Sequence, residues 1–337
     1  MPHRLSKSRV RQLLGAAASS KILVLGDVML DQFIWGDVGR ISPEAPVPVV
    51  DFRRESFIPG GAANVARNLS ALTGPTELFG VLGRDTAGRN LKRLLQKQQI
   101  GCAGLVSVAD RATSVKTRIV AHQQQVVRLD RETRAPIGPG VKQRLLKILD
   151  AHLPEAAAVI VGDYGKGVVT QDLLDDIKAI CRDRGVWLSL DPKPVHRLNL
   201  SGLSLITPNR REAFELAEIP DETRQADPLS DRNLREVIDT LLGKLKPAVL
   251  LVTLGELGMV LCGANHPPFH IPTQAQEVFD VSGAGDTVIA SFTLAIAVGA
   301  SPVEAAILSN HAAGIVVGKV GTATVTPEEL LASFAGR

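Results

Sequence analysis

Short runs of apolar residues alternate along the chain with segments in which apolar residues recur at helical spacing. The apolar runs predict buried strands at residues 21–25, 76–81, 158–161, 187–190, 204–206 and 248–252. The segments between them predict helices at residues 62–72, 89–98, 141–152, 171–183, 210–217 and 233–245. This alternation is typical of an α/β fold with a doubly wound, mostly parallel sheet flanked by helices. Ligands of such sheets bind at the carboxyl ends of the strands.

Two segments interrupt this alternation. Prolines between Ile41 and Val50 exclude a helix within residues 32–58 and favour extended chain. Residues 113–129 show the alternating pattern of strands. Neither segment lies within a β-α unit. We therefore expect both to form a small separate β-sheet that acts as a lid over the cleft, inserted in a single domain of residues 1–337.

Composition excludes several classes of function. The formal net charge is only +3 and aromatic residues make up 4% of the chain, which argues against a nucleic-acid partner. The three cysteines are scattered, without a C-x-x-C pair. This pattern suits a reducing cytoplasm and excludes a disulfide scaffold or a cysteine zinc site.

Two apolar segments are too short to be membrane signals. Residues 1–20 join basic residues to a brief apolar run and lead directly into the first predicted strand, so we expect a surface helix there. Residues 287–300 are apolar and uncharged, but a bilayer requires about 20 such residues. We therefore expect a buried core helix there, and a cytoplasmic protein without a membrane partner.

The turn Gly283-Ala284-Gly285 leads directly into this apolar helix. The glycines allow a tight turn, and the first helical N–H groups have no intrahelical partners, so the turn predicts an anion site. Asp286 follows in the first helical turn. A carboxylate beside a bound phosphate is unfavourable unless it takes a proton from an attacking hydroxyl. The alternative is that Asp286 only caps the helix.

Two further segments contain candidate sugar-binding residues near the same cleft. Asp31 comes shortly after the first strand, where it could bind sugar hydroxyls or cap a turn. Gly60 and Gly61 lead into a helix and allow backbone to approach a ligand closely. Asn64 in that helix can both donate and accept hydrogen bonds, although the segment could also be an ordinary helix start.

The segments 60–64, G-G-A-A-N, and 283–286, G-A-G-D, resemble the two signatures of the ribokinase-like sugar kinases, or PfkB family, over essentially the whole chain. The resemblance implies phosphoryl transfer from ATP to a sugar hydroxyl. It implies that Asp286 is the base and that the amides of Gly283, Ala284 and Gly285 form the anion hole. The residues expected to hold the sugar are Asp31, Gly60, Gly61 and Asn64.

The resemblance also assigns residues to ATP and its ions. Asn209 and Glu212 match the N-x-x-E motif that organises Mg²⁺ through water. The residues expected to bind ATP are Lys193, Asn209, Thr253, Gly255, Gly258 and Asn310. Asp280 and Ser282 match positions that hold a monovalent cation in many members, which makes K⁺ a candidate cofactor. Val281 departs from the Thr that many members have there.

Two nucleotide-binding motifs can be set aside. Residues 314–320 are similar to a P-loop, but the spacing is one residue short and no Ser or Thr follows Lys319. We expect the end of a core helix there. No G-x-G-x-x-G follows a predicted strand, which argues against a nicotinamide enzyme.

Residues 40–50 and 317–326 narrow the resemblance to the D-glycero-β-D-manno-heptose-7-phosphate kinases. These make heptose 1,7-bisphosphate on the route to ADP-heptose for lipopolysaccharide. Many are fused to an adenylyltransferase with an H-x-G-H motif, and no histidine of this chain forms that pattern, so the resemblance implies the kinase alone. Alternatives are a kinase of ribose, fructose phosphate or a nucleoside, and a sugar-binding protein without catalysis.

A sugar phosphate requires a cationic pocket. Arg84, Arg118 and Lys166 are the candidates for binding the 7-phosphate, and Lys116 and Arg128 lie in the same lid segment as Arg118. The alternative is that these charges are only solvated or ion-paired. The β-rich inserts would leave apolar edge strands in water, so we also expect a homodimer that forms through the lid.

Overall fold

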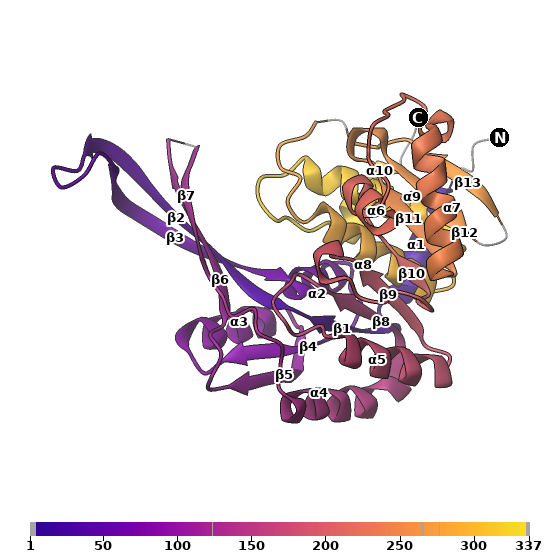
Figure 1. The fold of residues 1–337 in the computed structure, drawn as a ribbon, viewed down its shortest axis with the longest axis horizontal. Coiled ribbons are helices and arrows are strands. Elements are labelled where there is room, and N and C mark those ends of the chain that lie inside the picture. The colour runs from indigo at the N-terminus through magenta and orange to yellow at the C-terminus, as the bar shows by residue number, and fades with distance from the viewer. Residues whose placement is uncertain (1–4, 123, 264–265, 276, 335–337) are drawn as a thin grey trace.

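A nine-stranded sheet forms the centre of the molecule (Figure 1). The computed structural model describes residues 5–122, 124–263, 266–275 and 277–334. The strands, in their order across the sheet, are β13 (His266–Ile271), β12 (Met259–Gly263), β11 (Val249–Thr253), β10 (Leu205–Ile206), β9 (Trp187–Asp191), β8 (Ala156–Gly162), β1 (Lys21–Gly26), β4 (Thr76–Gly83) and β5 (Gly101–Val108). Neighbours from β5 to β11 pair in parallel, whereas β12 and β13 add an antiparallel edge.

Helices cover both faces of this sheet, as the alternation of patterns predicts. One apolar layer contains residues of α1 (Lys7–Ala17), α2 (Ala62–Ala71), α3 (Thr86–Lys97), α8 (Ala284–Ala297), α9 (Pro302–Val317) and α10 (Pro327–Ser333). The other contains residues of α4 (Pro139–His152), α5 (Gln171–Asp183), α6 (Arg210–Ala217) and α7 (Arg232–Leu245). Successive residues of β1 alternate between the layers, since Ile22 packs in the first and Leu23 in the second.

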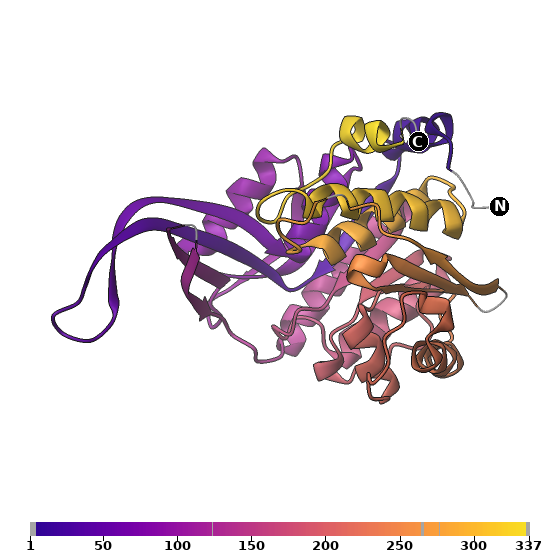
Figure 2. The ribbon, with the colours of Figure 1, turned by 90° about the horizontal axis from the view of Figure 1, so that it is seen from above.

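A second, four-stranded sheet projects from the body like an arm (Figures 1 and 2). It contains β3 (Pro48–Gly61), β2 (Val28–Ile41), β6 (Ser114–Ala121) and β7 (Gln124–Arg131), in that order. β2 pairs antiparallel with β3 and parallel with β6. β6 in turn pairs antiparallel with β7. The small separate sheet predicted from residues 32–58 and 113–129 is therefore confirmed. Its strands reach back to Val28 and Gly61, so the sheet begins at the two segments predicted to bind sugar.

All six predicted strands of the main sheet are present. Among the described residues, the two edge strands, β5 and β13, were missed in the sequence, and so was β12, which lies between β13 and β11. The predicted core helices at residues 287–300 and around Gly314 correspond to α8 and α9. The surface helix expected within residues 1–20 is α1, which packs one face on the body through Val10, Leu13 and Ala17 and leaves its other residues exposed or half-buried. Within the described ranges, no helix combines the length and the apolar character needed to cross a membrane.

Candidate active site

The glycine turn at residues 283–285 starts helix α8. Gly283 is the N-cap and has a φ of +81°, a conformation that favours glycine. A Cβ atom at this position would lie 2.8 Å from Nδ2 of Asn64, so a larger residue would displace that amide. The turn thereby brings the start of α8 against α2. This arrangement agrees with the anion site predicted from the sequence, although its ligand remains a prediction.

Asp286 lies in the first turn of α8 and accepts hydrogen bonds on both carboxylate oxygens. Asn64 in α2 donates from Nδ2 to Oδ2 over 2.7 Å, and the hydroxyl of Tyr164 donates to Oδ1 over 2.5 Å. A buried bond of 2.8 Å from Thr287 to Asn68 also joins the two helices. No side-chain cap forms at the described N-terminus of α8. Asp286 therefore holds partners from other elements instead of capping its own helix.

The surroundings of Asp286 shift its acidity in opposing directions. Burial raises the pKa of Asp286 above its usual range, and the charge of Asp31 adds to this effect. The hydrogen bonds from Asn64 and Tyr164, together with the charge of Lys193, lower it. The net result is a raised pKa, which makes this carboxylate a stronger base than one exposed to water.

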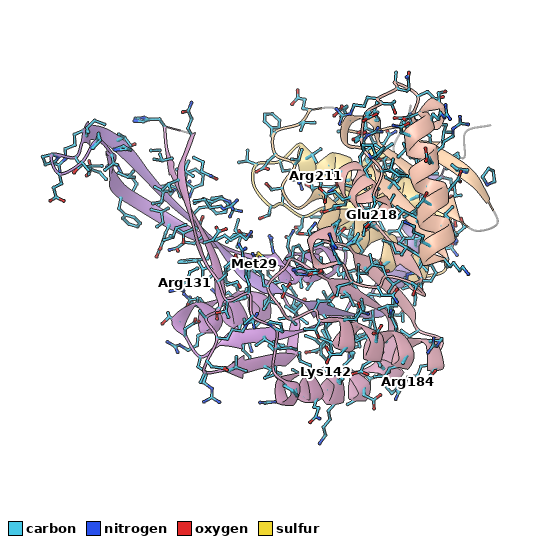
Figure 3. The ribbon with its side chains drawn as sticks, in the orientation of Figure 1. Met29, Arg131, Lys142, Arg184, Arg211 and Glu218 are labelled. Carbon is cyan, nitrogen blue, oxygen red and sulfur yellow. The ribbon has the colours of Figure 1, made fainter. Side chains whose placement is uncertain are left out.

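Asp31 lies at the start of the small sheet and faces the same place. It is buried, and its Oδ1 accepts a hydrogen bond of 2.5 Å from Nη1 of Arg118 in β6. A side chain on Gly60 would overlap the Asp31 carboxylate, which explains a glycine there. Met29, labelled in Figure 3 where the small sheet meets the body, packs against Gly61. The four predicted sugar-binding residues are thus close to the start of one hairpin and to Asp286.

Two residues of this site were missed in the sequence. Tyr164 is the chain's only tyrosine and follows Asp163, directly after the end of β8. A lone tyrosine at the carboxyl end of a strand was the feature of the sequence that could have indicated its role. Arg67 lies one helical turn after Asn64 and donates from Nη1 to its Oδ1 over 2.9 Å. It also donates to the carbonyl of Thr322 over 3.2 Å, which brings the 317–326 segment into the site.

A third missed residue, Asp27, holds the loop that carries Tyr164. Its Oδ2 accepts from the backbone N–H groups of Tyr164 and Lys166, each over 2.9 Å. Its Oδ1 accepts from the N–H of Val168 over 3.0 Å. Asp27 is almost completely buried, so these bonds replace the solvation that its carboxylate loses.

The predicted Mg²⁺ motif lies at the start of α6. Asn209 and Glu212 form a capping box, in which each side chain accepts from the other residue's backbone N–H over 3.0 and 2.9 Å. The other oxygen of Glu212 accepts from Nζ of Lys193 over 2.5 Å. Asn209 therefore has a structural role, while Glu212 also faces Lys193.

The carboxylates around Lys193 carry surplus negative charge. Burial raises the pKa of Asp191 to about 7, and the charges of Glu212 and Asp286 contribute to this shift. Burial opposes the charge of Lys193, yet Asp191 and Glu212 keep its pKa above the usual value. Oxygen donors with negative charge suit a hydrated Mg²⁺ ion. Among the described residues, no three His, Cys, Asp or Glu side chains are grouped so that they could hold a metal directly. The residues present therefore fit only an ion that keeps most of its water ligands, as the N-x-x-E motif implies.

The other residues assigned to ATP gather beyond the carboxyl end of β11. Thr253 ends this strand and forms a β-bridge with Asn209. Gly255 and Gly258 follow in a tight turn, both with positive φ. Asn310 in α9 is buried and donates from Nδ2 to the carbonyl of Pro272 over 2.6 Å. The fold thus places these residues at the carboxyl end of β11, next to the start of α6.

Asp280 supports the approach to the glycine turn. Its Oδ1 accepts from the N–H of Ser282 over 2.9 Å, and its Oδ2 accepts from that of Gly321 over 3.2 Å. Val281 between them is 68% exposed. Asp280 therefore connects this segment with the residues after α9, and its role toward K⁺ stays a prediction.

Two of the three candidate phosphate ligands are ion-paired. Arg118 is paired with Asp31, and Lys166 is paired with Glu132 over 2.5 Å, with both of the latter side chains buried. Arg84 is exposed after β4, and within the described residues it forms no ion pair. The ion-paired alternative therefore holds for Arg118 and Lys166 in this structure.

Residues 19–329 match the profile of the pfkB family carbohydrate kinases. The chain belongs to this family. The expected PfkB membership is thus confirmed. Relatives include the "Bifunctional protein HldE" of Caulobacter sp. (strain K31), 44% identical over 94% of this chain and 63% of that protein. Another is that of Geobacter sulfurreducens, 41% identical over 98% of this chain and 66% of that protein. The chain thus spans slightly less than two thirds of the length of these relatives.

Solved structures confirm the ribokinase-like fold of this PfkB protein. Arabidopsis thaliana ribokinase complexed with ribose and ATP superimposes with a TM-score of 0.75 at 19% identity, over 95% of this chain and 100% of that one. Phosphofructokinase-2 from Escherichia coli in complex with potassium gives a TM-score of 0.76 at 20% identity, over 94% and 98% of the two chains. At these identities the likeness concerns the fold.

Proposed function

We propose that this PfkB protein transfers the terminal phosphoryl group of ATP to the anomeric C1 hydroxyl of D-glycero-β-D-manno-heptose 7-phosphate. The products are heptose 1,7-bisphosphate and ADP, and the reaction serves ADP-heptose synthesis for lipopolysaccharide. The observation that carries the kinase assignment is the position of Asp286, beside the glycine turn of α8 and hydrogen-bonded on both oxygens. We assign the reaction to the cytoplasm, where ATP is supplied.

In this proposal Asp286 takes the proton of the C1 hydroxyl as its oxygen attacks the terminal phosphorus of ATP. The bond between that phosphorus and the bridging oxygen breaks, and ADP leaves with the bond's electron pair. The amides of Gly283, Ala284 and Gly285 bind the oxygens of the transferring group, where negative charge must be stabilised. The sugar ring is held by Asp31, Gly60, Gly61 and Asn64, and this fixed orientation lowers the entropy cost of reaction.

The nucleotide would lie toward β11 and α6, next to Lys193, Asn209, Thr253, Gly255, Gly258 and Asn310. A bound Mg²⁺ supplies charge neutralisation on the phosphate oxygens. Support for its position comes from Asp191, whose pKa of about 7 reflects burial among negative charges that a cation would relieve. We propose that Glu212 orients the metal's water ligands, and that Asp280 binds K⁺.

The choice of acceptor is supported by the resemblance of residues 40–50 and 317–326 and by the 40–44% identity to the HldE proteins. Residues 317–326 lie at the site, since the Thr322 carbonyl accepts from Arg67. Residues 40–50 lie at the tip of the β2–β3 hairpin, far from α8 (Figures 1 and 2). Residues 40–50 therefore cannot contact an acceptor held at Asp286 of the same chain.

One face of the small sheet could receive the acceptor's phosphate. Register places Asp31, Lys116 and Asp130 side by side across β2, β6 and β7, and it places Arg118 beside Arg128. Among the described residues Lys116 forms no ion pair. Burial, followed by the charges of Lys166 and Arg128, lowers the pKa of Lys116.

The neighbouring cations Arg118, Arg128 and Lys166 are paired with carboxylates, so among the described residues of this face Lys116 is the cation left for a phosphate dianion. We therefore propose Lys116 as a phosphate ligand alongside Arg84, Arg118 and Lys166. The small sheet would then act as a lid over the bound acceptor.

A homodimer through the small sheets completes the proposal. On the hairpin and on β7, Phe52 is 63% exposed, Ile41 60% and Leu129 65%. Apolar side chains in this position are covered when a second copy docks against the arm. In such a dimer, residues 40–50 at the hairpin tip would contact the surface of the second copy.

The test compares acceptors under identical ATP and Mg²⁺ concentrations: heptose 7-phosphate, unphosphorylated heptose, ribose and fructose 6-phosphate. Charge-assisted contacts contribute about 1.5–3 kcal/mol each, so loss of two should lower kcat/KM at least about a hundredfold. Binding energy from the remote phosphate should raise kcat as well as lower KM. If ribose or free heptose is used equally well, the acceptor is wrong while the kinase assignment stands.

A further inference from the structure

We propose that Tyr164 is a positioning residue that aims the Asp286 carboxylate at the acceptor hydroxyl and favours its ionised form. This inference rests on the proposed function, since it takes Asp286 as the base. No substrate contact is required of Tyr164. Its effect is transmitted through the hydrogen bond to Asp286 alone.

Hydrogen bonds from two different elements fix the orientation of the Asp286 carboxylate. Tyr164 donates to Oδ1 over 2.5 Å from the loop after β8, and Asn64 donates to Oδ2 over 2.7 Å from α2. Rotation of the Asp286 side chain would break at least one of these bonds. Each carboxylate oxygen still has a lone pair available, so an acceptor hydroxyl can approach an oxygen whose direction is already set.

Tyr164 is itself held firmly. Asp27 accepts from its backbone N–H over 2.9 Å and binds the loop again at Lys166 and Val168. The ring packs against the end of β8, where a Cβ on Gly162 would lie 2.9 Å from ring atom Cε2. Only a glycine there leaves room for the ring. The hydroxyl therefore reaches Asp286 from a loop with little freedom to move.

The hydrogen bond also affects charge. Burial and the nearby charge of Asp286 raise the pKa of Tyr164 well above its usual value, so the hydroxyl remains a donor throughout the working pH range. Burial raises the pKa of Asp286, and the hydrogen bond from Tyr164 counteracts this. The other charged groups that face the pair are Asp27 after β1, Asp31 in β2, Arg67 in α2, Asp191 in β9 and Lys193 after it.

The sign of the pH effect follows from the role of Asp286. The base must be ionised to accept a proton, so activity rises as pH passes its pKa. Removing the Tyr164 hydroxyl removes a contact that stabilises the ionised form, so the pKa of Asp286 should rise further. The acid side of the rate profile should then move to higher pH.

The experiment measures kcat and KM against pH for the full chain and for Tyr164→Phe, with whichever acceptor the screen above identifies. We expect the acid limb of kcat to move up by about one pH unit, which is roughly a tenfold loss at acid pH, with the KM for ATP changed less than about twofold. Thr76→Val is the control, because it removes a buried hydroxyl bond of 2.8 Å to the Gly74 carbonyl away from the site. An acid limb that stays in place, or that moves equally in Thr76→Val, would overturn the proposal.

A second readout needs no acceptor. The carboxyl-carbon NMR signal of Asp286, assigned by its absence from Asp286→Asn, should titrate at higher pH in Tyr164→Phe than in the unaltered chain. If Asp286→Asn loses activity while both titrations coincide, only the role of Tyr164 is wrong. If Asp286→Asn keeps its activity, the base assignment fails and this inference fails with it.

Discussion

Asp286→Asn should abolish most turnover without weakening the fold. Asparagine has nearly the same shape, and its oxygen can accept from Asn64 where Asp286 now accepts over 2.7 Å. Its amide then faces Tyr164, whose hydroxyl now donates over 2.5 Å but can turn to accept instead. Both hydrogen bonds can therefore be replaced. What the variant loses is the ability to take a proton.

Positioned base catalysis contributes roughly 10²–10⁴ in rate, which is about 3–5 kcal/mol in the barrier. We expect kcat to fall by this factor, while ATP binding measured by calorimetry stays as tight or becomes tighter, because a negative charge beside the phosphates is removed. A coupled assay for ADP, run at saturating acceptor, provides kcat. The preparation must be checked by mass spectrometry for reversion of asparagine to aspartate. Turnover close to that of the unaltered enzyme in a fully exchanged sample would remove Asp286 from its role.

Stability supplies an independent check on the same residue. The pKa of Asp286 is raised in the folded chain, so its ionised form is less favourable there than in the unfolded chain. Its contribution to the free energy of unfolding is fully present below the pKa that Asp286 has in the unfolded chain. This contribution is lost as the pH rises through the pKa that Asp286 has in the folded chain. At neutral pH, Asp286→Asn should therefore have a Tm equal to or above that of the unaltered chain, and the difference should shrink toward acid pH. A lower Tm at neutral pH would contradict the burial argument.

Further predictions test neighbouring parts of the site. Gly283→Ala should lower both Tm and kcat, because alanine at positive φ costs about 1–2 kcal/mol and its Cβ would displace Asn64; thermal unfolding and the ADP assay measure the two effects, and unchanged values would refute the close approach. Glu212→Gln retains a capping residue, so it should fold normally yet require roughly tenfold more Mg²⁺ for half-maximal rate; an unaltered Mg²⁺ titration would count against the metal assignment. Lys116→Met should raise the KM for a phosphorylated acceptor at least about tenfold without affecting that for ATP, and the exposed Lys92→Met serves as its control. Sedimentation at micromolar concentration should show a homodimer that Leu129→Glu converts to monomers, whereas a fully active monomer would exclude the dimer.

The local pattern of the chain was sufficient for the layered fold and for the two glycine turns. Central strands are buried on both faces, so each leaves a continuous apolar run such as residues 158–161 in β8. The glycines at the starts of α2 and α8 mark backbone that no other residue fits, and this local requirement is visible in the sequence. Strands β5 and β13 lie at the sheet's edges, where burial is incomplete and the apolar run is broken, and β13 contains two prolines. Those strands were therefore missed.

The partners of each charged group depended on the tertiary structure. Tyr164 and Asp286 are separated by 122 residues, and Asn64 and Asp286 by 222, so no local pattern relates them. Likewise, nothing around Lys166 in the sequence indicates that Glu132 neutralises it in a buried pair. Residue type and spacing determined which groups could bind phosphate, sugar or metal. Only the packing of α2, α8 and the β8 loop decided which of them meet, because buried polar groups take their partners from whatever the fold brings within hydrogen-bonding distance.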